Sequence, residues 1–160
     1  MAIQVGERIP EATLLKATAE GPQPVSTNDY FAGRKVALFS VPGAFTPTCS
    51  VKHLPGFVEK ADQLKAGGVD EIACVAVNDA FVMQAWGAQA GADGKVTMLA
   101  DGNGDFARAL GLTMDASKFG MGERGQRWSA IVDDGVVKEL NVEEPGAFSV
   151  SSADYMLGQL

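Results

Sequence analysis

The chain has 160 residues, 46% of them hydrophobic and 21% charged, a composition typical of a globular protein with a buried core. Its formal charge of −7 argues against nucleic acid or an anionic membrane as a partner, because both call for basic surfaces. No apolar run approaches the ~20 residues of a membrane span, and residues 1–10 lack the pattern of a signal peptide. Two cysteines are too few for a disulfide scaffold. We therefore expect a cytoplasmic protein, or an organelle-matrix protein whose presequence was removed.

The first half of the chain predicts a strand, a helix and a second strand. Residues 36–41 form an apolar run of strand length. A helix is expected to begin at Thr46-Pro47, because Thr is a good N-cap and Pro is favoured at the first helical position. Pro55 should kink this helix, and residues 72–77 form a second buried strand. This order predicts a βαβ unit with parallel strands.

The second half continues the alternation and then changes to an antiparallel pattern. Asn78 is expected to cap a helix, and the glycine-rich segment 113–126 predicts an irregular loop. Asp134-Gly135 is a hairpin signal. Ser151 resembles the start of a capping box before a last helix. The remaining expected elements are strands over 95–100, 127–132 and 136–142 and a short helix ending near Gly111.

This order of elements predicts the fold class. Strands that alternate with helices and then end in a hairpin indicate an α/β protein, with helices on both faces of a mixed sheet. A thioredoxin-like core with N-terminal additions fits the order. There is no repeat, low-complexity tract or linker, so residues 1–160 are expected to form a single domain.

Cys49 is the residue on which a chemical function would depend. It falls in the first turn of the predicted helix, where free backbone N–H groups and the positive end of the helix dipole favour an anion. A thiolate is such an anion, and it is the reactive form of cysteine. The alternative is a small buried cysteine that only fills space near a strand–helix turn. The residues alone leave both interpretations open.

The segment around Cys49 resembles a known active site. Pro42-x-x-x-Thr46-x-x-Cys49 is similar to the signature of the peroxiredoxins, and residues 41–57 resemble the type II, or peroxiredoxin-5-like, subfamily of the AhpC/TSA superfamily. The likeness extends over nearly the whole chain. It implies a thioredoxin-like fold and a thiol-dependent peroxidase that reduces hydrogen peroxide and alkyl hydroperoxides through a cysteine sulfenic acid. It also implies regeneration by glutathione with glutaredoxin, or by thioredoxin.

The resemblance assigns roles to four residues. Cys49 would be the nucleophile, Thr46 and Arg127 would position and polarise the peroxide, and Pro42 would shape and shield the pocket. Capping alone would explain Thr46, and most arginines are surface charges. Arg127 is singled out because the family's active-site Arg precedes an aromatic–Ser pair, here Trp128-Ser129. Strand alternation turns Arg127 and Trp128 to opposite faces.

Cys74 has two interpretations. It lies within a predicted apolar strand, as a core thiol would. Some type II relatives pair two cysteines at this spacing, which makes Cys74 a candidate resolving cysteine for Cys49. A disulfide needs Cα atoms within about 7 Å, so the first helical turn would have to unwind. Other relatives use a later cysteine, which segment 148–151 does not contain. Direct reduction by an external thiol is the alternative.

Three phenylalanines and one histidine complete the candidates. Phe45, Phe81 and Phe119 would ordinarily belong to the core, whereas the resemblance places such residues at the pocket rim and in a homodimer contact. His53 follows Cys49 by one turn, but a Cys–His protease would need an orienting partner that no motif supplies. One His and two Cys give no metal-site spacing, and no cofactor is expected.

Two functions of other classes remain as alternatives at this stage. One is a redox-sensing or holdase-like binding protein whose Cys49 oxidises slowly and changes its affinity for a partner. The other is a thioredoxin-like disulfide reductase, against which the missing C-x-x-C pair counts.

Overall fold

The computed structural model describes residues 1–160 and contains nine strands and six α-helices. The strands are β1 (Thr13–Thr18), β2 (Gly21–Ser26), β3 (Lys35–Ser40), β4 (Glu71–Ala76), β5 (Thr97–Ala100), β6 (Thr113–Asp115), β7 (Glu123–Gly125), β8 (Trp128–Asp133) and β9 (Val136–Val142). The α-helices are α1 (Thr27–Phe31), α2 (Leu54–Glu59), α3 (Ala61–Ala66), α4 (Ala80–Gln89), α5 (Asp105–Leu110) and α6 (Ala153–Leu157). Two short segments have other helical geometry, the π-helix η1 (Cys49–His53) and the 3₁₀ helix η2 (Ser117–Phe119). None of the helices combines the length and the apolar character that a membrane crossing requires.

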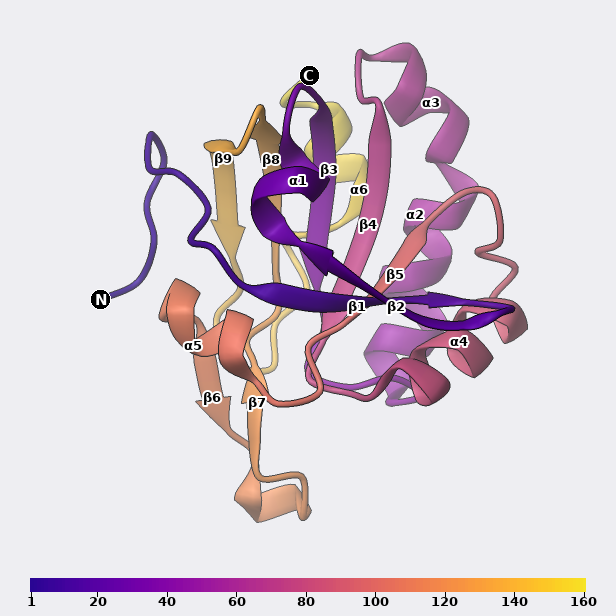
Figure 1. The fold of residues 1–160 in the computed structure, drawn as a ribbon, viewed down its shortest axis with the longest axis vertical. Coiled ribbons are helices and arrows are strands. Elements are labelled where there is room, and N and C mark those ends of the chain that lie inside the picture. The colour runs from indigo at the N-terminus through magenta and orange to yellow at the C-terminus, as the bar shows by residue number, and fades with distance from the viewer.

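Seven strands form one mixed sheet in the order β2-β1-β5-β4-β3-β8-β9 (Figure 1). The three central strands β5, β4 and β3 are parallel, as the predicted strand–helix–strand unit requires. The N-terminal hairpin β1–β2 extends the sheet beside β5, and the hairpin β8–β9 extends it beside β3, both in antiparallel pairing. The predicted mixed sheet with N-terminal additions is therefore confirmed.

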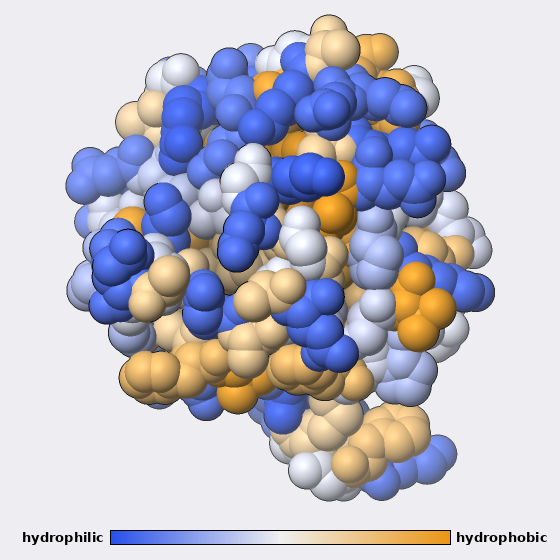
Figure 2. Space-filling view, turned by 90° about the vertical axis from the view of Figure 1, so that its right-hand side faces the viewer, coloured by the Kyte–Doolittle hydropathy of each residue, from blue (hydrophilic) through white to orange (hydrophobic).

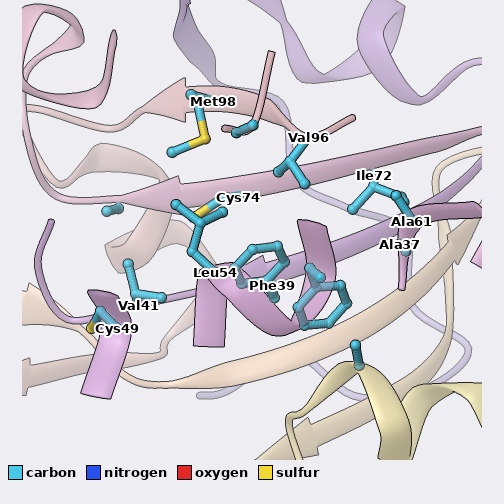
Figure 3. Close-up of a cluster of buried hydrophobic side chains, with 14 of the residues drawn as sticks. Ala37, Phe39, Val41, Cys49, Leu54, Ala61, Ile72, Cys74, Val96 and Met98 are labelled. Atoms are coloured by element: carbon cyan, nitrogen blue, oxygen red, sulfur yellow. The ribbon is translucent and has the colours of Figure 1, made fainter. Parts of the chain in front are cut away.

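Helices cover both faces of the sheet, and each face has its own buried cluster. The larger cluster has 22 buried residues beneath α2, α3, α4 and α6, including Phe39, Leu54 and both cysteines (Figure 3). The smaller cluster has 16 buried residues, to which α1 and α5 contribute. Along β8, Trp128 faces the smaller cluster and Ile131 the larger one, as strand alternation predicts. The predicted covering of both faces by helices is confirmed.

The helix after β3 begins at Pro47 as expected, but its next turn is π-helical. The Leu54 N–H donates to the Cys49 carbonyl, one residue farther back than the acceptor in an α-helix. Pro55 follows at the second position of α2 and has no N–H to donate, so an α-helical ladder could not have continued through it unbroken. The predicted kink at Pro55 is thus preceded by a wider turn. Cys49 and His53 lie at the two ends of this turn, and both are fully buried.

Three local predictions outside the Cys49 segment are wrong. Segment 113–126 is not an irregular loop, because β6 and β7 pair as an antiparallel hairpin that projects from the rest of the molecule (Figure 1). These strands have three residues each, too few for a periodic pattern to show. Asp79 rather than Asn78 caps α4, and Ser152 rather than Ser151 caps α6. The side chains of the two residues predicted as caps form other hydrogen bonds: Asn78 accepts from the Ala44 N–H, and Ser151 donates to Glu143.

Candidate active site

The pairing of β3 with β8 brings Arg127 to Cys49. Ser40 at the end of β3 lies opposite Trp128 at the start of β8. Arg127 immediately precedes β8, so it lies where the chain leaves β3 on its way to the helix that contains Cys49. Its Nη2 group is 3.0 Å from the Cys49 Sγ atom, across 78 positions of sequence. The structure therefore brings together the two residues that the resemblance singled out.

Cys49 is fully buried, but its sulfur is not enclosed by hydrocarbon alone. The residue belongs to the larger cluster, and Arg127, which is half-buried, reaches the sulfur from the edge of that cluster. Burial favours the neutral thiol, whereas a guanidinium in contact favours the thiolate. The sulfur therefore has a cationic donor in contact with it, rather than apolar atoms on every side.

His53 holds the guanidinium from its other side. Arg127 Nη1 is 2.8 Å from His53 Nδ1, and His53 Nε2 is 2.9 Å from the Ser151 carbonyl oxygen. A guanidinium can only donate and a carbonyl can only accept, so Nδ1 is the acceptor and Nε2 carries the proton. Burial, together with the neighbouring charge of Arg127, lowers the pKa of His53 to about 3. The histidine is therefore neutral at physiological pH and acts as a fixed acceptor for Arg127.

The loop between β3 and the helix is held in a strained turn. Phe45 has a positive φ of 64°, a region that bulky residues rarely occupy. The Thr46 hydroxyl donates to the Gly43 carbonyl at 2.7 Å, and the Ala44 N–H donates to Asn78 Oδ1 at 2.9 Å. The Thr46 hydroxyl accepts no hydrogen bond from an N–H of the helix, so the predicted side-chain cap is not formed. Asn78 is not a cap because it binds this loop.

The other candidates lie in different surroundings. Pro42 is half-buried at the start of the loop, with its carbonyl oxygen 3.5 Å from Arg124 Nη1. Cys74 lies in β4 between β3 and β5, and its full burial raises the pKa of its thiol. Both cysteines are free thiols in the larger cluster, and in the view of Figure 3 Val41 and Leu54 appear between them. The structure thus places Cys74 in the core, away from the loop that contains Thr46.

The three phenylalanines are surface residues rather than core. The exposed fractions of Phe45, Phe81 and Phe119 are 49%, 72% and 71%. Phe45 is the one that approaches a buried aromatic ring, with its centroid 6.4 Å from that of Trp86. Phe81 and Trp86 both belong to α4 but are five positions apart, about 140° around the helix axis, so they lie on different sides of it. The buried side of α4 consists of Ala80, Met83, Trp86 and Gly87, and Phe81 lies outside it.

Sequence reasoning missed most of the residues that hold Arg127. His53 was weighed as a protease base or a metal ligand, and its four-residue distance from Cys49 was the signal for a shared role. Phe148 lies with its ring centroid 5.9 Å from the Arg127 guanidinium carbon. Ser151 supplies a backbone carbonyl, a group that no side-chain pattern reports.

Comparison with known proteins decides the family. Residues 4–157 match the Redoxin family. The chain is 55% identical to "Peroxiredoxin-2E-2, chloroplastic" of Oryza sativa subsp. japonica, an alignment that covers 99% of this chain and 72% of that protein. The chain is a peroxiredoxin. It is also 48% identical to peroxiredoxin-2B of Arabidopsis thaliana, over 99% of this chain and 98% of that protein.

A solved structure supports the same conclusion. The crystal structure of reduced Prx3 in complex with H₂O₂ from Vibrio vulnificus superposes with a TM-score of 0.94 at 54% identity, and the match covers 98% of each chain. The thioredoxin-like fold and the membership of the peroxiredoxins predicted from the sequence are confirmed. The peroxiredoxin is thus a thiol-dependent peroxidase.

The neutral state of His53 predicts a specific pH dependence of stability. The unfolded chain binds a proton to this residue near pH 6.5, whereas the folded protein does so only near the lowered pKa of about 3. Its contribution to stability is therefore complete above about pH 6.5 and is lost as the pH falls. Between about pH 7 and pH 5 the wild type should lose about 2 kcal/mol more free energy of unfolding than His53→Gln, measured by urea denaturation.

Glutamine is the matched replacement, because it offers one acceptor and one donor and does not titrate. Other groups contribute equally to both proteins and cancel in the comparison. Parallel stability curves for the two proteins over this range would show that His53 is not held neutral in the folded state.

Proposed function

We propose that Cys49 is the thiolate that attacks the peroxide and that Arg127, Thr46 and Pro42 prepare the substrate. The contact of 3.0 Å between Arg127 Nη2 and Cys49 Sγ is the observation that supports this assignment. The sulfur attacks the terminal oxygen of ROOH, a new S–O bond forms and the O–O bond breaks. Cys49 becomes a sulfenic acid, and the leaving RO⁻ takes up a proton. The two electrons that reduce the peroxide come from the sulfur.

Arg127 and Thr46 have complementary hydrogen-bonding capacity for this step. Two of the N–H-bearing nitrogens of Arg127 are engaged with His53 and Cys49, and the remaining donors can reach the leaving oxygen as its negative charge develops. The Thr46 hydroxyl already donates its proton to Gly43, so its free lone pairs suit it to accept the O–H of the peroxide. Pro42 has no N–H and no polar side chain, so it can close the loop side of the pocket without competing for the substrate.

Regeneration of Cys49 is proposed to use an external thiol. Cys74 lies in β4, which is paired with strands on both sides, so it can move only if the centre of the sheet is disrupted. Burial also raises the pKa of the Cys74 thiol and so disfavours the thiolate that would have to attack the sulfenic acid. Glutathione with glutaredoxin, or thioredoxin, would form a mixed disulfide with Cys49 and release water, and a second thiol would restore the Cys49 thiol.

The two cysteines should respond differently to substitution by serine. Cys49→Ser should lower the single-turnover rate of peroxide consumption by at least about a thousand-fold, because a hydroxyl is not ionised at neutral pH. Cys74→Ser serves as the matched control and should leave the first oxidation unchanged. Mass spectrometry of the peroxide-treated wild type should show sulfenic acid at Cys49. Full activity of Cys49→Ser would refute its role, and a Cys49–Cys74 disulfide would refute external reduction.

Arg127→Lys should reduce kcat/KM for hydrogen peroxide by about a hundred-fold. A lysine ammonium is a single point donor group and cannot contact both His53 and Cys49 as the planar guanidinium does. Steady-state kinetics with saturating thiol reductant measure the effect. Arg108→Lys is the control, because Arg108 forms exposed ion pairs with Asp105 and Glu123. Equal activity of the two variants would remove Arg127 from the mechanism.

The exposed phenylalanines are proposed to form the contact of a homodimer. Figure 2 shows an apolar band along the lower part of one face, next to the lobe formed by the β6–β7 hairpin. Phe119 lies near the tip of this hairpin, Phe81 on α4 and Phe45 in the loop that precedes Cys49. Large exposed aromatic residues typically mark an interaction surface. A second copy of the chain, with the same exposed residues, would bury them symmetrically.

The double variant Phe81→Glu/Phe119→Glu should shift the protein from dimer to monomer in sedimentation experiments at micromolar concentration. Two charges buried at an interface without partners cost far more than a dimer contact of this kind gains. Val5→Glu is the control, since Val5 is 57% exposed near the N-terminus. A wild-type protein that sediments as a monomer would refute the proposal at once.

A further inference from the structure

The carboxylate of Glu143 accepts hydrogen bonds from four donor groups of one short loop. Its two oxygens accept from the backbone N–H groups of Ser149, Val150 and Ser151 at 2.8–2.9 Å and from the Ser151 hydroxyl at 2.7 Å. Glu143 follows β9 and is buried. No cation forms a salt bridge with it. A buried carboxylate that accepts from three consecutive backbone N–H groups and a hydroxyl fixes the conformation of that segment.

The loop held by Glu143 presents two groups to the active site. The Ser151 carbonyl accepts from His53 Nε2 at 2.9 Å, and the Phe148 ring lies against both His53 and Arg127. The Glu143 backbone N–H also donates to the Arg127 carbonyl at 3.0 Å. Glu143 is therefore connected to Arg127 in two ways. Its backbone N–H contacts the Arg127 backbone, and its carboxylate is linked to the Arg127 guanidinium through Ser151 and His53.

We propose that Glu143 is a positioning residue for Arg127 and acts through Ser151 and His53. This inference rests on the proposed role of Arg127 in peroxide reduction. The Ser151 carbonyl keeps the proton on His53 Nε2 and so leaves Nδ1 free to accept from Arg127. If the loop moves, the imidazole loses this restraint, and the guanidinium loses its second anchor. It then spends less time against the Cys49 sulfur.

The indirect connection has an electrostatic advantage. A carboxylate in direct contact with Arg127 would form an ion pair and compete with the Cys49 thiolate for the same charge. Here the group in contact with Arg127 is a neutral imidazole, and the negative charge of Glu143 is stabilised by the N–H donors of the loop. Although burial raises the pKa of Glu143, the hydrogen bonds from Ser149, Ser151 and Val150 outweigh it and lower the pKa below its usual value. The carboxylate is therefore ionised at neutral pH.

The decisive variant is Glu143→Gln in the full chain. Its amide offers one oxygen in place of two, and its NH₂ would face at least the Ser149 N–H, so the loop should loosen. We expect kcat/KM for hydrogen peroxide to fall about ten-fold. We also expect the pH midpoint of the thiolate ultraviolet absorbance of the Cys74→Ser protein to rise by about one unit when Glu143→Gln is added. The exposed neighbour variant Glu144→Gln is the control and should change neither value.

A purely structural role predicts lower thermal stability with an unchanged thiolate midpoint, and that result would overturn the inference.

A double variant tests whether the two residues act together. When Glu143→Gln is added to Arg127→Lys, kcat/KM should fall by less than about two-fold further, because both residues act through one guanidinium. If Glu143→Gln does not fold, Ser151→Ala removes only the hydroxyl contact, and an unchanged midpoint there would overturn the inference equally. Loss of activity in Arg127→Lys with full activity in Glu143→Gln would refute this inference alone, whereas full activity in Arg127→Lys would refute the proposed function.

Discussion

The fixed position of the Arg127 guanidinium is the constraint on which the site depends. Nη2 contacts the Cys49 sulfur and Nη1 contacts His53, while the backbone carbonyl accepts from the Glu143 N–H. A free arginine side chain loses about 2 kcal/mol of rotamer entropy when it is held in one geometry. In this protein folding supplies that ordering before any peroxide arrives. The positive charge beside the sulfur is therefore preorganised, which is the condition under which electrostatic stabilisation is most effective.

The neutrality of the histidine matters as much as its position. Arg127 forms no salt bridge with a carboxylate, so its positive charge is not shared with an acidic side chain. His53 can serve as the acceptor because its burial in the larger cluster, beside a cation, keeps it unprotonated. The π-turn produces this arrangement, because it buries Cys49 and His53 together at the start of the helix. The apolar surroundings of the larger cluster thus keep His53 neutral, and the neutral His53 holds Arg127 against the Cys49 sulfur.

The features of the fold and the site that could be predicted are those that depend on residues close together in the sequence. The helix start at Pro47, the parallel unit and the alternation along β8 follow from periods and turn chemistry within a few residues. The bonds that build the site are not local: Asn78 reaches Ala44 across 34 positions, and His53 reaches Ser151 across 98. Composition could not separate Arg127 from other arginines either, and the family resemblance was needed to select it. The π-turn had a local cause in Pro55, but a proline signals a kink without specifying its geometry.

The loop around Phe45 connects the candidate active site to the outer surface. A left-handed backbone at a phenylalanine costs on the order of 1–3 kcal/mol, so the surrounding hydrogen bonds must over-determine it. Asn78 holds Ala44, and the Thr46 hydroxyl holds Gly43, so the turn is fixed on both sides of Phe45. The turn orients the Thr46 hydroxyl, and it leaves the Phe45 ring exposed at the surface. A second copy of the chain that covered this ring would oppose the relaxation of the turn, and the proposed dimer would thereby help to keep Thr46 oriented for the peroxide.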